Sequence, residues 1–413
     1  MTRFRSALIP LTLTLTTFTA LPQQAVAAPP KPVPSAAAQP SQTQPSQTQP
    51  AQTQPAQTQP AQTQPADARP PSSCARTVRG AAVNTRLTSL FTAYGNDNSR
   101  TDDWTGADGT YSLRLPSGRE LWIFSDTFLG RVNPDGSRPP VVGEGGDTVF
   151  LNNSFAVEKK GRLSTIHDGT PAAPTAVMPP RDRDHWYWAG DATLAGNVVE
   201  VTYQEYERFG TGAWDWRWHR NVVARFAPGR LERPIGVHPL PSGHGVAWGS
   251  GILEHRGHTY VYGVEDHGSP KYMHVARVKG RSLLGRWEYL KADGTWSANE
   301  TDSARVMSGV ANEYSVTRMG GGYVLITHDT TEPLSAKIVA YFSCSPAGPF
   351  TGKQHVYTTP ETGGNIFTYN AHAHPQISGA GLVVSYNVNS FVNTDHYRDV
   401  SIYRPRFLDV TFE

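Results

Sequence analysis

Residues 104–128 have the sequence WTGADGTYSLRLPSGRELWIFSDTF, and this stretch decides our interpretation of the fold. Apolar and aromatic residues alternate with polar ones on both sides of a Pro-Ser-Gly segment at 116–118, a pattern typical of a half-buried β-hairpin. Asp108 lies where the first strand begins, and Asp126 lies where the second strand ends. Because the start of one antiparallel strand lies beside the end of the next, we expect both carboxyl groups at the same edge of the sheet.

The hairpin pattern recurs four more times along the chain. The later copies cover residues 188–206, 248–266, 311–329 and 371–389, each with an apolar strand, a glycine turn and a second aromatic or β-branched strand. The anchor residues of the five copies recur about every 60 residues after a longer first step: they are Asp108, Asp191, Gly251, Glu313 and His374. A Gly- and Pro-rich loop at 130–147 accounts for the longer step. A third strand is expected after each hairpin, at 154–157, 221–226, 273–278, 337–342 and 400–403.

A repeat of this length with about four short strands predicts an all-β, five-bladed β-propeller. A β-sandwich and a right-handed β-helix are the alternatives. A sandwich would not repeat its strand pattern, and the rungs of a β-helix are much shorter than this repeat. Residues 84–93 form the one weak helical candidate. We expect the segment 74–94 to close the ring by packing beside residues 407–412.

The N-terminal part of the chain has a different composition. Residues 1–27 predict a secretory signal peptide, since Arg3 and Arg5 precede an apolar stretch at 7–21 and a small-residue site at 25–27. An uncleaved anchor is the alternative. Residues 28–73 include five copies of (Ser/Ala)-Gln-Thr-Gln-Pro without a large apolar residue, which predicts a disordered linker or spacer. The propeller domain then covers residues 74–413 of a protein that is secreted, extracellular or cell-wall associated.

The chain has two cysteines, Cys74 and Cys344. In an exported protein, two cysteines far apart in sequence predict a disulfide bond. Two buried thiols are the alternative.

Composition and missing motifs exclude several classes of function. The net charge is only +2 and basic residues are scattered, which argues against a nucleic-acid partner. The sequence has no Gly-x-Ser-x-Gly, Walker, HExxH or CxxC motif, and the Asp box of sialidase propellers is also missing. We expect no cofactor and no membrane span in the mature protein, and a structural calcium on the propeller axis stays an open alternative.

The innermost strands of a propeller converge on its axis, so the expected strand starts ring one mouth. The candidate catalytic residues at this mouth are carboxylates: Asp108, Asp126, Glu313 and Asp191. Paired carboxyl groups are what cleavage of a glycosidic bond uses, one giving a proton and the other activating water or attacking. The alternative for Asp126 is to close the hairpin by bonding backbone N–H groups, and the Asp108–Gly109 pair is also common in turns.

Aromatic and polar residues near the same strand ends are the candidate substrate-binding residues: Trp104, Trp188, Trp248, Glu205, Glu265, His372, His374 and Asn387. Flat apolar rings suit the C–H faces of sugars. His372 and His374 lie on one face of a strand, but two ligands are too few for a metal, so sugar binding or a structural role is favoured. The alternating tryptophans 214, 216 and 218 are interpreted as blade packing.

Residues 106–112 (GADGTYS) together with 122–128 (WIFSDTF) resemble the first blade of a family of secreted bacterial proteins that is known as a domain of unknown function. That family resembles the five-bladed endo-D-arabinanases, which cut the arabinan of mycobacterial-type cell walls, and is more remotely similar to the arabinanase, xylosidase and invertase superfamily. The resemblance covers residues 95–413. It implies that the two essential acids are Asp108 and Asp126. In the remote superfamily a base, a pKa-tuning aspartate and an acid sit on different blades, and Glu313 is the candidate for that acid.

The sequence therefore predicts a secreted glycoside hydrolase that acts on a cell-wall or plant-type polysaccharide, with arabinan-like furanosides favoured. We expect a monomer in which Asp108 is the general acid and Asp126 the base or nucleophile. The alternative is a non-catalytic propeller that binds glycans or another protein.

Overall fold

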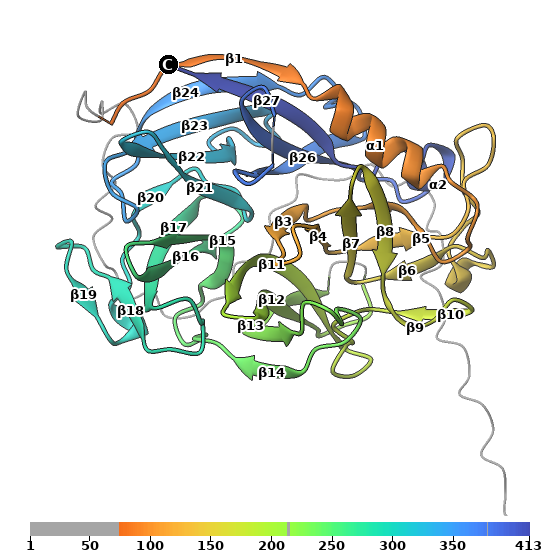
Figure 1. The fold of residues 1–413 in the computed structure, drawn as a ribbon, viewed down its shortest axis with the longest axis horizontal. Coiled ribbons are helices and arrows are strands. Elements are labelled where there is room, and N and C mark those ends of the chain that lie inside the picture. Colours follow the sequence, from red (N-terminus) through yellow and green to blue (C-terminus); the bar gives the residue numbers. More distant parts are fainter. Residues whose placement is uncertain (1–73, 213–214, 378) are drawn as a thin grey trace, which may run out of the picture.

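The computed structural model describes residues 74–413, with residues 213, 214 and 378 excepted. The predicted signal peptide and linker lie outside the described residues. The described chain is built mainly of antiparallel strands, so the all-β prediction is confirmed (Figure 1). Within it, no helix is both long and apolar enough to cross a lipid bilayer.

Antiparallel sheets lie around a common centre, as in a β-propeller (Figure 1). In the order of the chain, the first sheet contains β3 (Tyr111–Arg114), β4 (Glu120–Phe124), β7 (Ser154–Lys159) and β8 (Arg162–Ile166), and the second contains β11 (His185–Ala195), β12 (Val198–Arg208), β13 (Trp216–Phe226) and β14 (Gly236–Pro239). The third contains β15 (Ala247–His255), β16 (His258–Asp266), β17 (Lys271–Lys279), β18 (Trp287–Leu290), β19 (Trp296–Ser297) and β20 (Met307–Ser308). The fourth contains β21 (Tyr314–Met319), β22 (Gly322–His328), β23 (Lys337–Ser343) and β24 (Thr351–Thr358), and the last contains β25 (Ile366–Ala373), β26 (Leu382–Ser390), β27 (Arg406–Phe412) and β1 (Val78–Val83). The strand β3 contacts β11, and contacts then link β11 to β15, β15 to β21 and β21 to β25.

Smaller elements lie beside these sheets. They are β2 (Trp104–Ala107), β5 (Thr127–Leu129) and β6 (Val149–Leu151) in one sheet, β9 (Asp168–Thr170) and β10 (Ala173–Thr175) in another, the helices α1 (Thr85–Gly95) and α2 (Asp395–Arg398), and the 3-10 turns η1 (Val142–Glu144) and η2 (Glu300–Asp302).

The five predicted hairpins are present as strand pairs. Four of the five predicted third strands are also present, as β7, β13, β17 and β23. The fifth, at 400–403, is wrong: this segment forms a turn, and β27 takes the third position instead. Tyr403 has a φ of 84°, which an extended strand does not adopt.

Three of the innermost strands, β11, β15 and β25, share a local irregularity that the repeat pattern does not show. In β11 the pairing register shifts between Ala189 and Ala192, and β15 and β25 shift at the corresponding place, after Trp248 and after Tyr369. Such bulges turn a side chain away from the regular alternation of a strand. In β11, the bulge contains Asp191.

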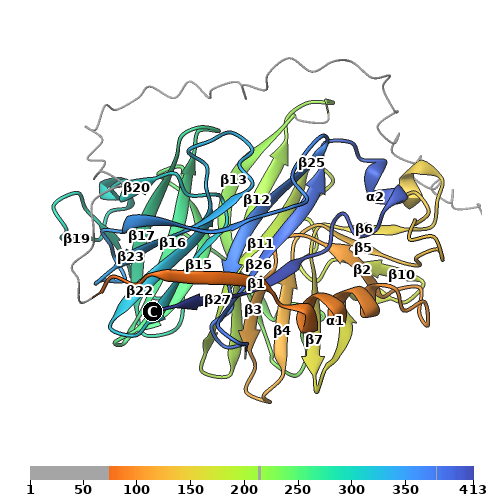
Figure 2. The ribbon, with the colours of Figure 1, turned by 90° about the horizontal axis from the view of Figure 1, so that it is seen from above.

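The start of the folded segment closes the ring, as expected. The strand β1 pairs with β27, and α1 follows it (Figure 2). Asn84 is the N-cap of α1, and its Oδ1 accepts a bond of 3.0 Å from the Leu87 amide. The predicted disulfide Cys74–Cys344 is confirmed. Because Cys344 directly follows β23, the disulfide joins the N-terminal segment to the neighbouring sheet.

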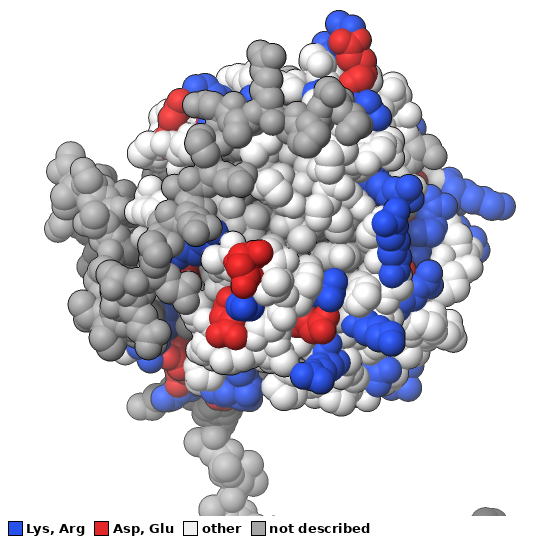
Figure 3. All heavy atoms as spheres, turned by 90° about the vertical axis from the view of Figure 1, so that its left-hand side faces the viewer, with Lys and Arg blue, Asp and Glu red and all other residues white. Residues whose placement is uncertain are grey.

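Apolar clusters fill the spaces between neighbouring sheets. One of them packs Leu121 and Phe155 of the first sheet against Val201 and Val222 of the next. The face drawn in Figure 3 is mostly uncharged, with acidic and basic side chains mixed over part of it.

Candidate active site

The first hairpin places Asp108 and Asp126 side by side. The Asp108 amide donates to the Asp126 carbonyl at 3.1 Å, and the Ser125 amide donates to the Asp108 carbonyl at 2.9 Å. Asp108 lies in the break between β2 and β3, and Asp126 lies in the break between β4 and β5. The hairpin therefore continues beyond both aspartates. Gly109 between them has a φ of 62°, and a Cβ there would lie 2.8 Å from the Ser125 hydroxyl. The close pairing therefore requires glycine at this position.

Two tyrosine hydroxyls hold the carboxyl group of Asp108. Tyr369 of β25 and Tyr403 of the turn before β27 donate to Oδ2 at 2.5 and 2.9 Å. Asn389 donates to the Tyr369 oxygen at 3.0 Å and orients it. Burial raises the pKa of Asp108 to about 6, and the two tyrosine hydroxyls limit the rise. Asp108 is therefore largely ionised at neutral pH.

Asp126 has different partners. Its Oδ1 accepts bonds from the indole N–H of Trp188 at 2.8 Å and from the Asn152 amide at 3.1 Å. Burial and the neighbouring charge of Asp108 raise the pKa of Asp126 to about 8, against the effect of these two donors. Two adjacent carboxyl groups that share a buried site cannot both ionise easily, so Asp126 keeps its proton when Asp108 is charged.

Glu313, just before β21, is the third carboxyl group near Asp108. Burial raises its pKa well above the ordinary value, the charge of Asp108 raises it further, and the Tyr111 hydroxyl lowers it. Its Oε2 is buried and has no hydrogen-bond partner among the described residues. Glu313 is thus a second protonated acid beside an ionised aspartate.

Asp191 lies in the bulge of β11. It accepts bonds from its neighbour Ala192 at 2.8 Å and from the Ile252 amide of β15 at 2.7 Å, and burial raises its pKa to about 7. Its Oδ2 lies 3.8 Å from Nε2 of His372, whose pKa burial lowers to about 3. The His372 ring in turn packs against Tyr111, with 4.7 Å between centroids. Asp191 and His372 therefore line the same interior as Glu313.

Aromatic side chains flank Asp126. The Trp188 ring lies 4.4 Å from that of Tyr206 and 5.2 Å from that of Trp216, and Trp186 lies 5.9 Å from Trp188. We call Trp186, Trp188, Tyr206 and Trp216 the aromatic wall; all four side chains are partly exposed. Trp214 lies outside the described residues.

Two of the three tryptophans that we expected on the rim lie in the core instead. Trp104 is 1% exposed and packs against Phe91 of α1, and Trp248 is 0% exposed within the cluster of its own sheet. Each ring is covered by an element from another part of the chain: α1 covers Trp104, and Trp287 and Tyr289 of β18 cover Trp248. Trp188 remains at the site.

The two predicted substrate-binding glutamates are held in ion pairs. Glu205 is fully buried between Arg220 and Arg181. Glu265 accepts two bonds from Arg305, at 2.6 and 2.8 Å, and also pairs with two histidines. Partial burial raises the pKa of Glu265, but Arg305 and the histidines outweigh this and leave it below the ordinary value. Both carboxylates are paired with arginines of the protein, which corrects the prediction that they bind substrate.

His374 and Asn387 are buried and have structural partners, which corrects their assignment as well. His374 bridges Ser112 of β3, at 2.6 Å, and Ser385 of β26, at 2.8 Å. Asn387 donates to the Thr110 hydroxyl at 3.0 Å and so supports the loop that carries Asp108. Both join the first and last sheets where the ring closes.

Sequence reasoning missed four residues that contact the carboxyl groups of the site or the groups that hold them: Tyr369, Tyr403, Asn152 and Tyr111. It also missed three members of the aromatic wall: Trp186, Tyr206 and Trp216. Asn152 directly follows the short strand β6, and Asp126 lies two residues after β4, so a polar residue just after a strand was a usable signal. The two tyrosines come from the far end of the chain, and their sequence surroundings carry no sign of a role.

The chain is similar in structure to a Bacteroides ovatus protein provisionally assigned as a hydrolase, with 23% identity, a TM-score of 0.65, and coverage of 80% of this chain and 90% of that one. It aligns with lower TM-scores to the GH43_1 enzyme of Xanthomonas citri (0.43, 15% identity, 78% and 92% coverage) and to an alpha-L-arabinanase mutant of Cellvibrio cellulosa (0.41, 10% identity, 76% and 92% coverage). Comparison with curated proteins finds no match. A family model described as a domain of unknown function, DUF5005, matches residues 90–412, and the chain therefore belongs to this family.

Proposed function

We propose that the protein is a glycoside hydrolase on a five-bladed propeller, and that it hydrolyses a polysaccharide with Asp108 and a protonated partner acid. One observation carries the proposal: neighbouring carboxyl groups on one hairpin have environments that separate their pKa values. A separated pair of this kind is what an acid–base mechanism at one glycosidic bond needs. The fold shared with the Bacteroides ovatus protein, provisionally a hydrolase, supports it.

We assign Asp108 as the base or nucleophile and Asp126 as the general acid. This reverses the roles expected from the sequence. Asp108 accepts two tyrosine hydroxyls, which favour its charged form, whereas burial and the charge of Asp108 favour the protonated form of Asp126. Glu313 is a second candidate for the acid, because it also keeps its proton beside Asp108.

The aromatic wall supports a carbohydrate as the substrate. Its exposed indole and phenol faces lie beside Asp126 and offer C–H stacking surfaces to a sugar ring. The resemblance to arabinan-cutting propellers favours a furanose-rich, arabinan-like polymer of a cell wall. Export by a signal peptide at 1–27, with residues 28–73 as a spacer, would bring the enzyme to such a polymer.

The rival function is a propeller that binds glycans without cleaving them. Turnover and binding measured on the same variant separate the two functions. For Asp126→Asn, the hydrolase predicts loss of turnover with oligosaccharide affinity retained, as measured by calorimetry. If wild type binds an oligosaccharide tightly but releases no product over days, the binding function is correct instead.

The pH dependence of kcat/KM follows from the two carboxyl groups. It should rise as Asp108 loses its proton through a pKa of about 6 and fall as Asp126 loses its proton through about 8. The expected profile is a bell with its maximum between these values, recorded on a soluble oligosaccharide. A rate that increases steadily up to pH 9 would contradict the assignment of Asp126.

Replacing Trp188 by Phe should shift the basic limb of this profile upward by about one pH unit. The change removes the N–H that stabilises ionised Asp126, and a hydrogen bond to a charged group contributes about 1.5–3 kcal/mol. The matched control is Trp186→Phe, which alters the same aromatic wall at a residue that contacts Trp188 by ring packing. An equal shift in both variants would show that loss of packing, rather than of the N–H, is responsible.

A further inference from the structure

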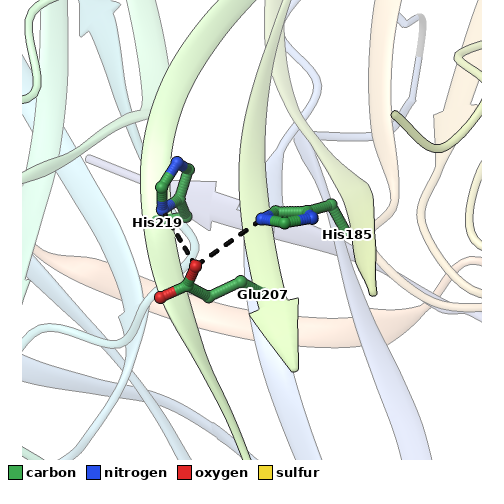
Figure 4. A group of neighbouring side chains, drawn as sticks. All are labelled: His185, Glu207 and His219. Carbon is green, nitrogen blue, oxygen red and sulfur yellow. Dashed lines mark ion pairs between the residues drawn. The ribbon is translucent and has the colours of Figure 1, made fainter. Parts of the chain in front are cut away.

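Two histidines and a glutamate form a cluster near one end of the second sheet. His185 lies on β11, Glu207 on β12 and His219 on β13, and one ligand atom of each lies within 4.8 Å of the other two (Figure 4). His185 Nε2 is 3.5 Å and His219 Nδ1 is 3.3 Å from the same carboxylate oxygen, Oε2. The three side chains thus converge on one point from three neighbouring strands.

The local pairing of the strands explains this convergence. His185 and Glu207 are direct partners in the register of β11 and β12, so their side chains lie on the same face. The register of β12 and β13 shifts where Glu205 pairs with Arg220 and Tyr206 pairs with Trp218, which leaves His219 as the extra residue. A bulge redirects a side chain in this way. Here it turns His219 toward Glu207.

Neighbouring groups orient the donor atoms. Asp182 lies 2.7 Å from Nδ1 of His185, which places the proton on Nδ1 and leaves the lone pair of Nε2 facing the cluster. Arg217 bonds Oε1 of Glu207 and leaves Oε2 directed at the histidines. A carboxylate behind a histidine is the usual support of a metal ligand.

We propose that His185, Glu207 and His219 bind a divalent transition metal ion, with Zn²⁺ as the best fit. An ion with bonds of about 2.0–2.1 Å in tetrahedral geometry separates its ligand atoms by about 3.3–3.4 Å, which is close to the two nitrogen–oxygen distances in the cluster. Imidazole and carboxylate ligands suit Zn²⁺, Cu²⁺ and Ni²⁺ rather than Mg²⁺ or Ca²⁺. Water completes the fourth position.

One cation in the structure competes with the ion. Arg181 Nη2 lies 2.5 Å from Nε2 of His185, where the metal would bind. Its side chain is 38% exposed, and its Nη1 already pairs with Glu205 at 3.2 Å. The metal displaces Arg181 from the histidine while the pair with Glu205 remains. Arg181→Gln should therefore strengthen metal binding.

A metal ion bound at this site would restrict the motion of the aromatic wall. Trp186 directly follows His185 in β11, and Tyr206 directly precedes Glu207 in β12. Adjacent residues of a strand point to opposite faces of the sheet. A metal that ties the ends of β11, β12 and β13 together would stiffen the strands that carry Trp186, Trp188, Tyr206 and Trp216. The proposal does not depend on the function of that wall.

Calorimetry with ZnCl₂ on untagged, EDTA-treated and dialysed protein tests the site. We expect one Zn²⁺ per chain and a higher thermal midpoint with Zn²⁺ than with EDTA. His219→Gln should abolish both effects, and Asp182→Asn should weaken binding by about tenfold or more. The matched control is His355→Gln, at an exposed histidine on β24, and should bind like wild type.

Thermal midpoints in EDTA show that each variant is folded, so loss of binding cannot be confused with loss of structure. Absence of stoichiometric Zn²⁺ binding by wild type would overturn the proposal. Binding that survives in both His185→Gln and His219→Gln would overturn it equally, because the ion would then bind elsewhere.

Discussion

Asp108→Asn should lower kcat by at least about a thousandfold, which is the upper part of the range for loss of one acid–base group. The amide has the size of the carboxyl group and keeps an oxygen for the hydroxyls of Tyr369 and Tyr403. It cannot carry the negative charge that activates water or attacks the sugar. Substrate affinity should stay within a few-fold of wild type, since the aromatic wall is untouched.

The chain offers a matched control for this substitution. Asp293 also precedes a glycine with positive φ, and its carboxylate caps the turn by accepting from the Thr295 amide at 2.9 Å and from its hydroxyl. It is exposed and lies in the turn between β18 and β19. Asp293→Asn should leave kcat unchanged. If Asp108→Asn kept more than a tenth of the wild-type rate, Asp108 would not be the base or nucleophile.

The second large effect concerns stability. Replacing both cysteines in Cys74→Ala/Cys344→Ala should lower the free energy of unfolding by about 4 kcal/mol, because the disulfide closes a loop spanning 270 residues. The unfolded chain gains the freedom that this crosslink removes. The native ring should also become less securely closed, since β1 relies on its pairing with β27 and on a bond of 2.8 Å from the Val78 amide to Gln354.

Denaturant unfolding of wild type and of the double alanine variant measures this effect. Wild type treated with a reductant should move to the midpoint of the variant, which separates the crosslink from the substitutions. Activity under folding conditions should be retained, because the strands next to the two cysteines, β1 and β23, belong to other sheets than β2 and β3, which flank Asp108. Equal midpoints for all three samples would show that the disulfide contributes nothing.

The strand pattern and the first acid pair were predictable because they depend on local sequence. Alternation and glycine turns define each hairpin, and antiparallel geometry alone places Asp108 beside Asp126. Cys74 and Cys344 were predictable for another reason: there are only two cysteines in the chain.

The environment of each side chain was not predictable, because it depends on packing between distant segments. In the sequence Trp104 looks like a residue of the rim, but in the structure Phe91 of α1 packs against it. In the sequence Glu265 looks like a free acid, but in the structure it accepts a hydrogen bond from Arg305, which lies beyond the next strands of the chain. The roles that we propose for Asp108 and Asp126 differ from the sequence expectation for the same reason, since the hydroxyl of Tyr403 comes from the last turn of the chain.

The most direct test of the central claim is the release of reducing ends from purified polysaccharides by residues 74–413, with product sizes determined by mass spectrometry. The panel should contain arabinogalactan, branched and linear arabinans, and xylan, each with wild type, Asp108→Asn and Asp293→Asn. We expect wild type and Asp293→Asn to release oligosaccharides from an arabinan-containing polymer and Asp108→Asn to release none above background. Equal product from wild type and Asp108→Asn, or no product from any polymer in the panel, would contradict the account.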